Sequence, residues 1–258
     1  MSATPPPASP DPAFIRVKDL TKTIGEQHIL RGVTLEIARG SGVAIIGGSG
    51  TGKSVFLKLV MGLIPATAGS IEVDGVEITK LSERNLGQHR RKIGLLFQDG
   101  ALFDSLTVEE NVGFPLVEAG MRDKEKIRQK VKETLEAVDL GEHLQKLPSS
   151  LSGGMRKRAA LARAIITNPQ CVLYDEPTSG LDPVVADSID HLIRRTQRRR
   201  GITSVVVTHD MKSLKTVADQ VIYLREGLVY FSGTPEELFS SKDDVIQQFV
   251  EGRSGESS

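Results

Sequence analysis

The sequence predicts an α/β fold whose central, mostly parallel sheet is covered by helices on both faces. Three near-continuous apolar runs support this, at 43–46, 171–174 and 204–207. Such runs are typical of parallel strands buried on both faces. A glycine-rich loop follows the first run, and two acidic residues follow the second. Ligands of open α/β sheets bind at the carboxyl ends of the strands, so we expect the functional site there.

The loop after the first run matches the phosphate-binding pattern G-x-x-x-x-G-K-[ST] in full. It consists of Gly47, Gly48, Ser49, Gly50, Thr51, Gly52, Lys53 and Ser54, and a helix-like stretch begins at Ser54 and Val55. Backbone N–H groups of such a loop cradle a polyphosphate, and the N-terminus of the following helix favours the anion. We expect Lys53 to reach the β and γ phosphates and Ser54 to bind Mg²⁺. A glycine-rich turn with a chance Lys-Ser pair would not explain the flanking strand and helix.

The composition of the chain argues against a nucleic-acid partner, a redox switch and a membrane-spanning segment. The chain has 258 residues, with 33 Lys and Arg against 33 Asp and Glu, so bulk charge favours no nucleic-acid partner. Cys171 is the single cysteine and lies in an apolar run, which favours core packing over a redox switch. No stretch is long and apolar enough to span a bilayer, and we expect any role at a membrane to need a partner.

The N-terminal part predicts short strands with alternating apolar residues. They are expected at 14–17, 29–30, 33–37 and 70–75, the last ending in an Asp-Gly turn, and a further apolar strand is expected at 93–98. Residues 1–12 are rich in Pro, Ala and Ser and are expected to be disordered. These strands predict an antiparallel β flank beside the central sheet.

The middle of the chain is charged and helical from Met121 to Leu147. Ile127, Val131, Leu135 and Val138 recur at helical spacing there. This segment predicts an inserted helical subdomain. A helix is then expected from Ser152-Gly153-Gly154 to the Asn168-Pro169 pair, because a helix usually ends before proline.

The C-terminal part predicts a helix over 184–199, a hairpin over 221–231 and a C-terminal helix that begins at Thr234-Pro235. The expected domain boundaries follow from this pattern. We expect residues 1–12 to form a tail, 13–240 the domain that carries the phosphate loop, and 241–258 a C-terminal helix with a frayed end. Within the domain we expect the core over about 13–99 and 156–235, and the helical subdomain over about 100–155.

Two carboxylates end the second apolar strand. Asp175 is suited to hold Mg²⁺, directly or through water, and Glu176 to orient the water that attacks the γ-phosphate. An Asp-Glu pair after a strand is common on its own, and the phosphate loop is what makes the functional interpretation strong.

The stretch Leu151-Ser152-Gly153-Gly154-Met155 resembles the signature motif of ABC-transporter ATPases. The resemblance implies that Ser152, Gly153 and Gly154 contact the γ-phosphate of ATP held by a second copy, so that the chain works as a homodimer. It also implies that Gln98 senses Mg²⁺ and water, that Asp182 lies in the loop touching the partner's phosphate loop, and that His209 contacts the γ-phosphate. The implied cofactors are ATP and Mg²⁺, with Lys53, Glu176 and His209 as catalytic residues.

Residues 96–116, with Met155 in place of the usual glutamine, are similar to the ATPases of bacterial Mla/MCE phospholipid transporters. The place of the aromatic residue that commonly stacks on adenine holds Ile24. The resemblance implies an integral-membrane permease, a periplasmic MCE lipid-binding protein, in some systems a STAS-domain partner, and a location at the cytoplasmic face of the inner membrane. Three apolar residues that follow Gln98 are Phe103, Leu106 and Phe114. They either line a groove that receives a helix of the permease or pack within the helical subdomain, and both interpretations stay open.

Two alternatives to a phospholipid-transporting ATPase remain. One is an ABC ATPase for another solute, such as an amino acid or an ion. The other is an ABC ATPase of DNA repair or translation, which usually needs two cassettes or a long coiled coil, neither of which is present. The basic run 194–200 fits the C-terminus of a helix capped by Gly201, with contact to anionic lipid or to nucleic acid as alternatives.

Overall fold

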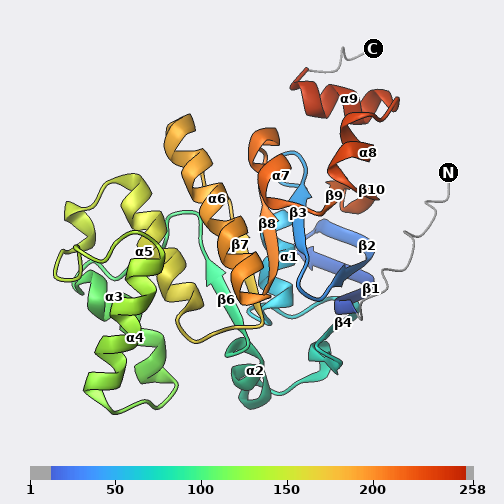
Figure 1. Cartoon of the computed structure of the whole chain (residues 1–258). Helices are drawn as coiled ribbons and strands as arrows, with labels where there is room; N and C mark the ends of the chain where they lie inside the picture. Colours follow the sequence, from blue (N-terminus) through green and yellow to red (C-terminus); the bar gives the residue numbers. More distant parts are fainter. Residues whose placement is uncertain (1–12, 254–258) are drawn as a thin grey trace.

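The computed structural model describes residues 13–253, and the expected disorder of residues 1–12 and the end of the expected frayed tail lie outside them. A six-stranded central sheet runs through the molecule in the order β10-β9-β3-β8-β7-β6 (Figure 1). Its strands are β3 (Gly42–Ile46), β6 (Ile93–Leu96), β7 (Cys171–Asp175), β8 (Thr203–Val207), β9 (Gln220–Arg225) and β10 (Leu228–Gly233). All pairings are parallel except the β9–β10 hairpin. The predicted parallel sheet is therefore confirmed.

A second, antiparallel sheet flanks the N-terminal side, as expected. It has the order β2-β1-β4-β5, with β1 at Ala13–Ile24, β2 at Gln27–Ala38, β4 at Ala68–Val73 and β5 at Val76–Glu77. The strand expected at 14–17 is too short, because β1 continues to Ile24. Its pairing register shifts after Val17, and Asp19 has a positive φ of 48°. This irregularity interrupts the apolar alternation on which the prediction rested.

Helices cover both faces of the central sheet (Figure 1). The helices of the described chain are α1 (Lys53–Val60), α2 (Glu83–Arg90), α3 (Val108–Glu118), α4 (Lys124–Ala137), α5 (Gly153–Ile165), α6 (Pro183–Arg200), α7 (Met211–Val217), α8 (Pro235–Phe239) and α9 (Asp244–Glu251). Helices α2 and α7 were not predicted, and α3 was predicted only as part of the helical subdomain expected over about 100–155. The single C-terminal helix expected from Thr234 is in fact two, because α8 ends at Phe239 and α9 restarts at the Asp243 cap.

The two faces of the central sheet bury separate apolar clusters. Ala44, Ile46 and Tyr174 point toward the side of α3–α6, whereas Ile45 and Leu173 point toward α1 and the antiparallel sheet. Cys171 is fully buried in the second cluster, and burial raises the pKa of its thiol. This supports the core-packing interpretation of the cysteine.

Helices α3, α4 and α5 form the helical group that the chain inserts between β6 and β7 (Figure 1). The N-terminus of α3 is fixed by a capping box, in which Thr107 accepts from the backbone of Glu110 and Glu110 accepts from the backbone of Thr107. Helix α5 packs against both α3 and α6. It therefore joins the inserted helices to the core that carries the sheet.

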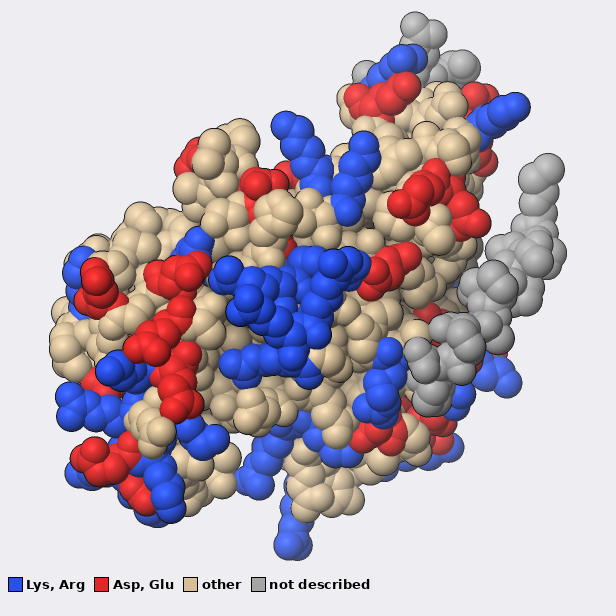
Figure 2. All heavy atoms as spheres, viewed as in Figure 1, with Lys and Arg blue, Asp and Glu red and all other residues tan. Residues whose placement is uncertain are grey.

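The basic run ends α6, and Figure 2 shows Lys and Arg gathered over this half of the helix. Gly201 adopts the left-handed conformation with φ 62° and caps the helix, as expected. Arg194 forms an ion pair with Asp219, and Arg195 approaches Asp139 at 3.5 Å. Part of this cluster is thus engaged within the chain, in keeping with a role at the helix terminus.

Candidate nucleotide site

The phosphate loop connects β3 to α1, and its shape requires glycine. Gly47 has φ 155°, and a Cβ there would collide with the carbonyl oxygen of Leu224. Gly52 has φ 96° and begins α1 without any side-chain cap among the described residues. The first N–H groups of a helix lack intrahelical partners. The N-terminus of α1 is therefore suited to receive an anion.

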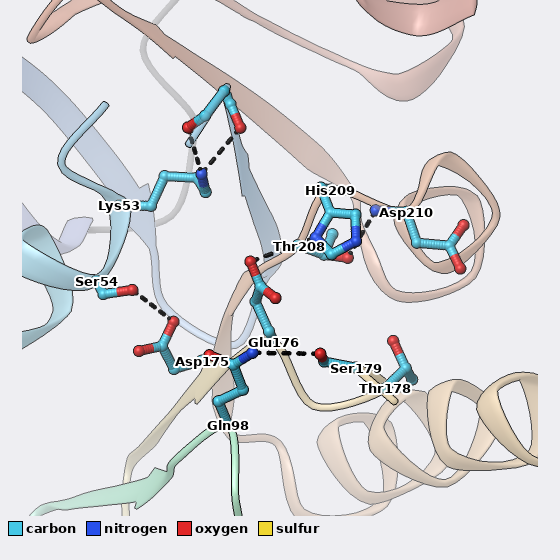
Figure 3. Close-up of polar contacts among 12 residues, drawn as sticks. Lys53, Ser54, Gln98, Asp175, Glu176, Thr178, Ser179, Thr208, His209 and Asp210 are labelled. Atoms are coloured by element: carbon cyan, nitrogen blue, oxygen red, sulfur yellow. Dashed lines mark hydrogen bonds and ion pairs between the residues drawn. The ribbon is translucent and has the colours of Figure 1, made fainter. Parts of the chain in front are cut away.

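Lys53 lies across this loop and is almost fully buried (Figure 3). Its Nζ atom donates to the carbonyl oxygens of Gly47 and Gly48, at 2.8 and 2.7 Å. Burial lowers the pKa of Lys53, while the carboxylates of Glu176 and Asp175 oppose this effect. The ammonium is thus held inside the loop where phosphate oxygens can replace the two carbonyls as its partners.

Ser54 and Asp175 meet although 121 positions separate them. The Ser54 hydroxyl donates to Oδ1 of Asp175 at 2.8 Å (Figure 3). Among the described residues, no group of three or more His, Cys, Asp or Glu side chains could hold a metal ion. A hydroxyl and one carboxylate nonetheless fit Mg²⁺, which is usually bound through one or two carboxylates, waters and substrate phosphates.

Glu176 and His209 form the next pair. Nδ1 of His209 lies 3.3 Å from Oε1 of Glu176. Glu176 has a φ of 46°, unusual for a residue with a side chain, and its N–H donates to the carbonyl of Val207 at 2.9 Å. This bond ties the end of β7 to the end of β8. It places the carboxylate beside the imidazole at the carboxyl edge of the sheet.

Gln98 follows β6 at the same edge. Its Nε2 atom donates to Oγ of Ser179 at 3.2 Å, which links the β6 end to the loop before α6 (Figure 3). A cavity of about 410 Å³ opens beside this loop, lined by Glu176, Ser179, His209 and residues of α6 and α7. The predicted residues Lys53, Ser54, Gln98, Asp175, Glu176 and His209 are thus brought together.

The signature residues lie at the start of α5. Ser152 caps this helix by accepting from the N–H of Met155 at 3.3 Å. A Cβ on Gly154 would come within 2.5 Å of Cγ1 of Val185 in α6. In the described part of the chain, no hydrogen bond joins Ser152 to the phosphate loop of the same chain.

Asp182 and three further predicted residues lie outside the group of side chains around Glu176. The carboxylate of Asp182 caps α6 by accepting from the N–H groups of Val184 and Val185, both at 3.1 Å. Ser49 and Gly50 are exposed in the phosphate loop, and Val55 is half-buried in the first turn of α1. None of these side chains contacts Glu176 within the described hydrogen bonds.

Sequence reasoning missed two buried polar residues beside the site. Lys157 in α5 donates to the carbonyl oxygen of Gln98, and Asp190 in α6 accepts from the Ser213 hydroxyl at 2.6 Å. Lys157 stands in a basic run and Asp190 in a polar helix pattern. Neither pattern distinguishes them from solvent-exposed charges, so no signal in the sequence could have found them.

Comparisons with known proteins agree with this geometry. Residues 30–179 match the family model described as ABC transporter. The chain therefore belongs to the ABC transporter family, and it is an ATP-binding, ATP-hydrolysing subunit of that class.

Individual relatives are similar over most of the chain. A protein of Mycobacterium leprae named "Probable ribonucleotide transport ATP-binding protein mkl" is 44% identical over 93% of this chain and 69% of its own length. The intermembrane phospholipid transport ATP-binding protein MlaF of Haemophilus influenzae is 40% identical over 93% of this chain and 91% of its own. A solved dimeric ATP-binding cassette bound to ADP and Pi superposes with a TM-score of 0.79 at 35% identity, covering 86% of this chain and 98% of that one.

No described helix has both the length and the apolar character needed to cross a lipid bilayer.

Proposed function

We propose that this chain is the motor subunit of a phospholipid transporter and works as a dimer that encloses ATP between its two copies. The observation that carries the motor function is the gathering of Lys53, Ser54, Asp175, Glu176 and His209 at one edge of the sheet (Figure 3). These are the groups that phosphoryl transfer to water requires: a phosphate cradle, metal-binding oxygens and a residue that orients water.

Within one copy, Lys53 and the amides of the phosphate loop bind the triphosphate. Ser54 and Asp175 would hold Mg²⁺, with Gln98 close by, and the ion would neutralise charge on the phosphate oxygens. Glu176 accepts a hydrogen bond from the attacking water and orients it toward the γ-phosphate. His209 lies beside this carboxylate at 3.3 Å and donates toward the developing charge on the phosphate.

The second half of the cage comes from the partner copy. Ser152, Gly153 and Gly154 open a helix whose N-terminal N–H groups favour an anion. No described hydrogen bond links Ser152 to the phosphate loop of its own chain, and we propose that the motif serves the nucleotide of a second copy. The similar cassette solved with ADP and Pi is itself a dimer, which supports this arrangement. ATP then joins the two copies, and its hydrolysis separates them.

A pair of exposed aromatic rings marks the surface for a permease. The side chains of Phe103 and Phe114 are 44% and 38% exposed, with ring centroids 5.0 Å apart. Asn111 fixes the turn before α3 by accepting from the N–H of Phe103 at 2.8 Å and donating to its carbonyl. Exposed aromatic residues in the segment that follows Gln98 suit an amphipathic helix from a membrane subunit. We assign this surface to an integral-membrane permease at the cytoplasmic face of the inner membrane.

Phospholipid is the cargo that the relatives support best. MlaF, whose name refers to intermembrane phospholipid transport, matches over 91% of its own length. A periplasmic MCE lipid-binding protein and a small STAS-domain protein complete the proposed assembly. A relative named for ribonucleotide transport and one named for methionine import support a second candidate, a solute other than lipid, such as an amino acid or an ion.

Affinity purification from native membranes tests the whole proposal. We expect a permease to copurify and phospholipid to be found in the complex by mass spectrometry. A Phe103→Ala, Phe114→Ala double variant should lose the permease while it still binds ATP. A complex that contains a permease but no lipid would refute the cargo, and a chain that recovers no membrane protein would refute the motor role.

A further inference from the structure

A buried lysine joins the signature helix to the catalytic edge of the sheet. Lys157 lies in the second turn of α5, and only 6% of its surface is exposed. Its Nζ atom donates to the carbonyl oxygen of Gln98 and, at 3.4 Å, to that of Glu176. One ammonium thus contacts the backbone of two residues that stand at the ends of different strands.

A second basic residue strengthens the same connection. Arg163, further along α5, donates to the carbonyl oxygens of Gly100 and Ala101, both at 2.7 Å. These two residues have positive φ angles of 76° and 47°. Helix α5 therefore holds the segment that follows Gln98 at several points. The helix and this segment are expected to move together.

The charge of Lys157 is compensated locally. Burial lowers the pKa of this lysine, and the nearby carboxylates of Asp99 and Glu176 oppose the shift. Hydrogen bonds to a charged donor are stronger than neutral ones. An apolar side chain in this place would leave two partly buried backbone carbonyls without their donor, which is costly.

The position of Lys157 on α5 gives these contacts a functional meaning. The helix begins at Ser152, the residue proposed to contact the partner's nucleotide, and Lys157 lies about one turn later. We infer that Lys157 is a positioning residue that couples the two nucleotide half-sites of one chain. When the ATP held by the partner copy binds the N-terminus of α5, the helix shifts. Lys157 transmits this shift to the backbone of Gln98 and Glu176 through its hydrogen bonds. This inference rests on the proposed function.

The test uses ATP hydrolysis by the full chain carrying Lys157→Met, Lys157→Arg or the control Lys58→Met. Lys58 is an exposed lysine of α1. We expect Lys157→Met to lower kcat by about 10- to 100-fold, because small displacements of catalytic groups have effects of this size. Its affinity for ATP as a monomer should stay close to the wild type, and its Tm should fall by about 2–10 °C because two backbone carbonyls lose their donor. Lys157→Arg should recover most of the activity, since a guanidinium also donates to carbonyls, and Lys58→Met should match the wild type.

A double-variant cycle distinguishes coupling from a structural role. If Lys157 acts through the signature residues, the loss in kcat caused by Ser152→Ala should be much smaller in the Lys157→Met background than in the wild type. Independent, multiplying losses would overturn the inference, and so would wild-type kcat in Lys157→Met. If Lys157→Met does not fold, the same cycle with Lys157→Gln, which keeps an N–H donor without the charge, decides by the same criterion. Wild-type protein without ATPase activity would instead refute the proposed function.

Discussion

His209 Nδ1 lies 3.3 Å from Oε1 of Glu176, so an imidazole at the end of β8 meets a carboxylate at the end of β7. The contact follows from the sheet, because β7 and β8 pair in parallel with Asp175 opposite Val207. Glu176 directly follows Asp175 and His209 follows Val207 by two positions, so both side chains lie at this edge of the sheet. The proposed role of Glu176 at this edge gives the first prediction.

Glu176→Gln should bind ATP and accumulate as a dimer but hydrolyse it at least about 100-fold more slowly. The amide keeps the size of the side chain but is a poor acceptor for the proton of the attacking water. Turnover by phosphate release and dimer formation by size-exclusion chromatography with ATP check both parts. The exposed Glu142→Gln serves as the matched control. Near-normal turnover in Glu176→Gln would remove Glu176 from the mechanism.

Ser54 and Asp175 should act through Mg²⁺ rather than through the nucleotide directly. Their 2.8 Å hydrogen bond places two oxygen ligands in one spot. We expect Asp175→Asn to raise the Mg²⁺ concentration needed for half-maximal ATP hydrolysis by about 10-fold or more, because a carboxylate ligand is lost. ATP binding in the presence of EDTA should be unchanged by the substitution. An unaltered Mg²⁺ dependence would show that the ion is held elsewhere.

Replacing two glycines by alanine should change the free energy of unfolding in opposite directions. A Cβ on Gly94 in β6 would collide with the carbonyl oxygen of Ala164 in α5, and this backbone atom has little room to move. Gly94→Ala should lower the free energy of unfolding by about 1–3 kcal/mol. Gly87 lies within α2 with nothing near its missing Cβ, so Gly87→Ala should raise it by about 0.5–1 kcal/mol. Urea unfolding measures both, and a stabilised Gly94→Ala would contradict the packing of β6 against α5.

Asp190 should make stability depend on pH between about 4 and 6. Burial raises the pKa of Asp190 to about 6, although the Ser213 hydroxyl opposes this, and Oδ1 has no partner among the described residues. In this pH window the folded chain keeps a proton that the unfolded chain has released. Stability therefore falls as pH rises from about 4 to 6, by about 1–3 kcal/mol, and the loss is complete above pH 6.

Replacing Asp190 should remove this slope. Asp190→Asn is expected to flatten the profile of unfolding free energy between pH 4 and 6. Between pH 4 and pH 7 the variant should therefore lose less unfolding free energy than the wild type loses. The exposed Asp104→Asn is the control and should keep the wild-type profile. Parallel profiles for Asp190→Asn and the wild type would show that this carboxylate does not titrate in the window.

Ile24 should weaken discrimination between bases. It is the last residue of β1 and 51% exposed, at the place where the ABC family commonly has an aromatic residue on adenine. Base–aromatic stacking contributes about 1–3 kcal/mol, which an aliphatic side chain does not supply in full. We expect similar affinities for ATP and GTP, and tighter ATP binding by Ile24→Tyr, both measured by calorimetry. ATP binding that is orders of magnitude tighter than GTP binding in the wild type would contradict this.

The sequence predicted the parts of this molecule that are set by local pattern. The buried strands and the phosphate loop follow from apolar runs and glycine spacing. Ser54, Asp175, Glu176 and His209 lie together because parallel strands end at one edge, and their roles stay predictions. Helix α2 was missed because its eight residues are almost entirely polar. Helix α3 falls inside the expected helical subdomain, but its bounds were not predicted because Pro115 and Gly113 obscure its pattern. Lys157 and Asp190 depend on tertiary packing, which leaves no trace in the residues around them.

The most direct test of the central claim is complementation between two inactive variants. Lys53→Ala lacks a working phosphate loop but keeps its signature residues, whereas Ser152→Arg keeps the loop but lacks the signature. If each nucleotide is enclosed by two copies, each variant alone should be inactive. Their mixture should regain ATPase activity, because a mixed dimer contains one intact composite site. A mixture that stays as inactive as its components, or full activity of Ser152→Arg alone, would contradict the two-copy cage.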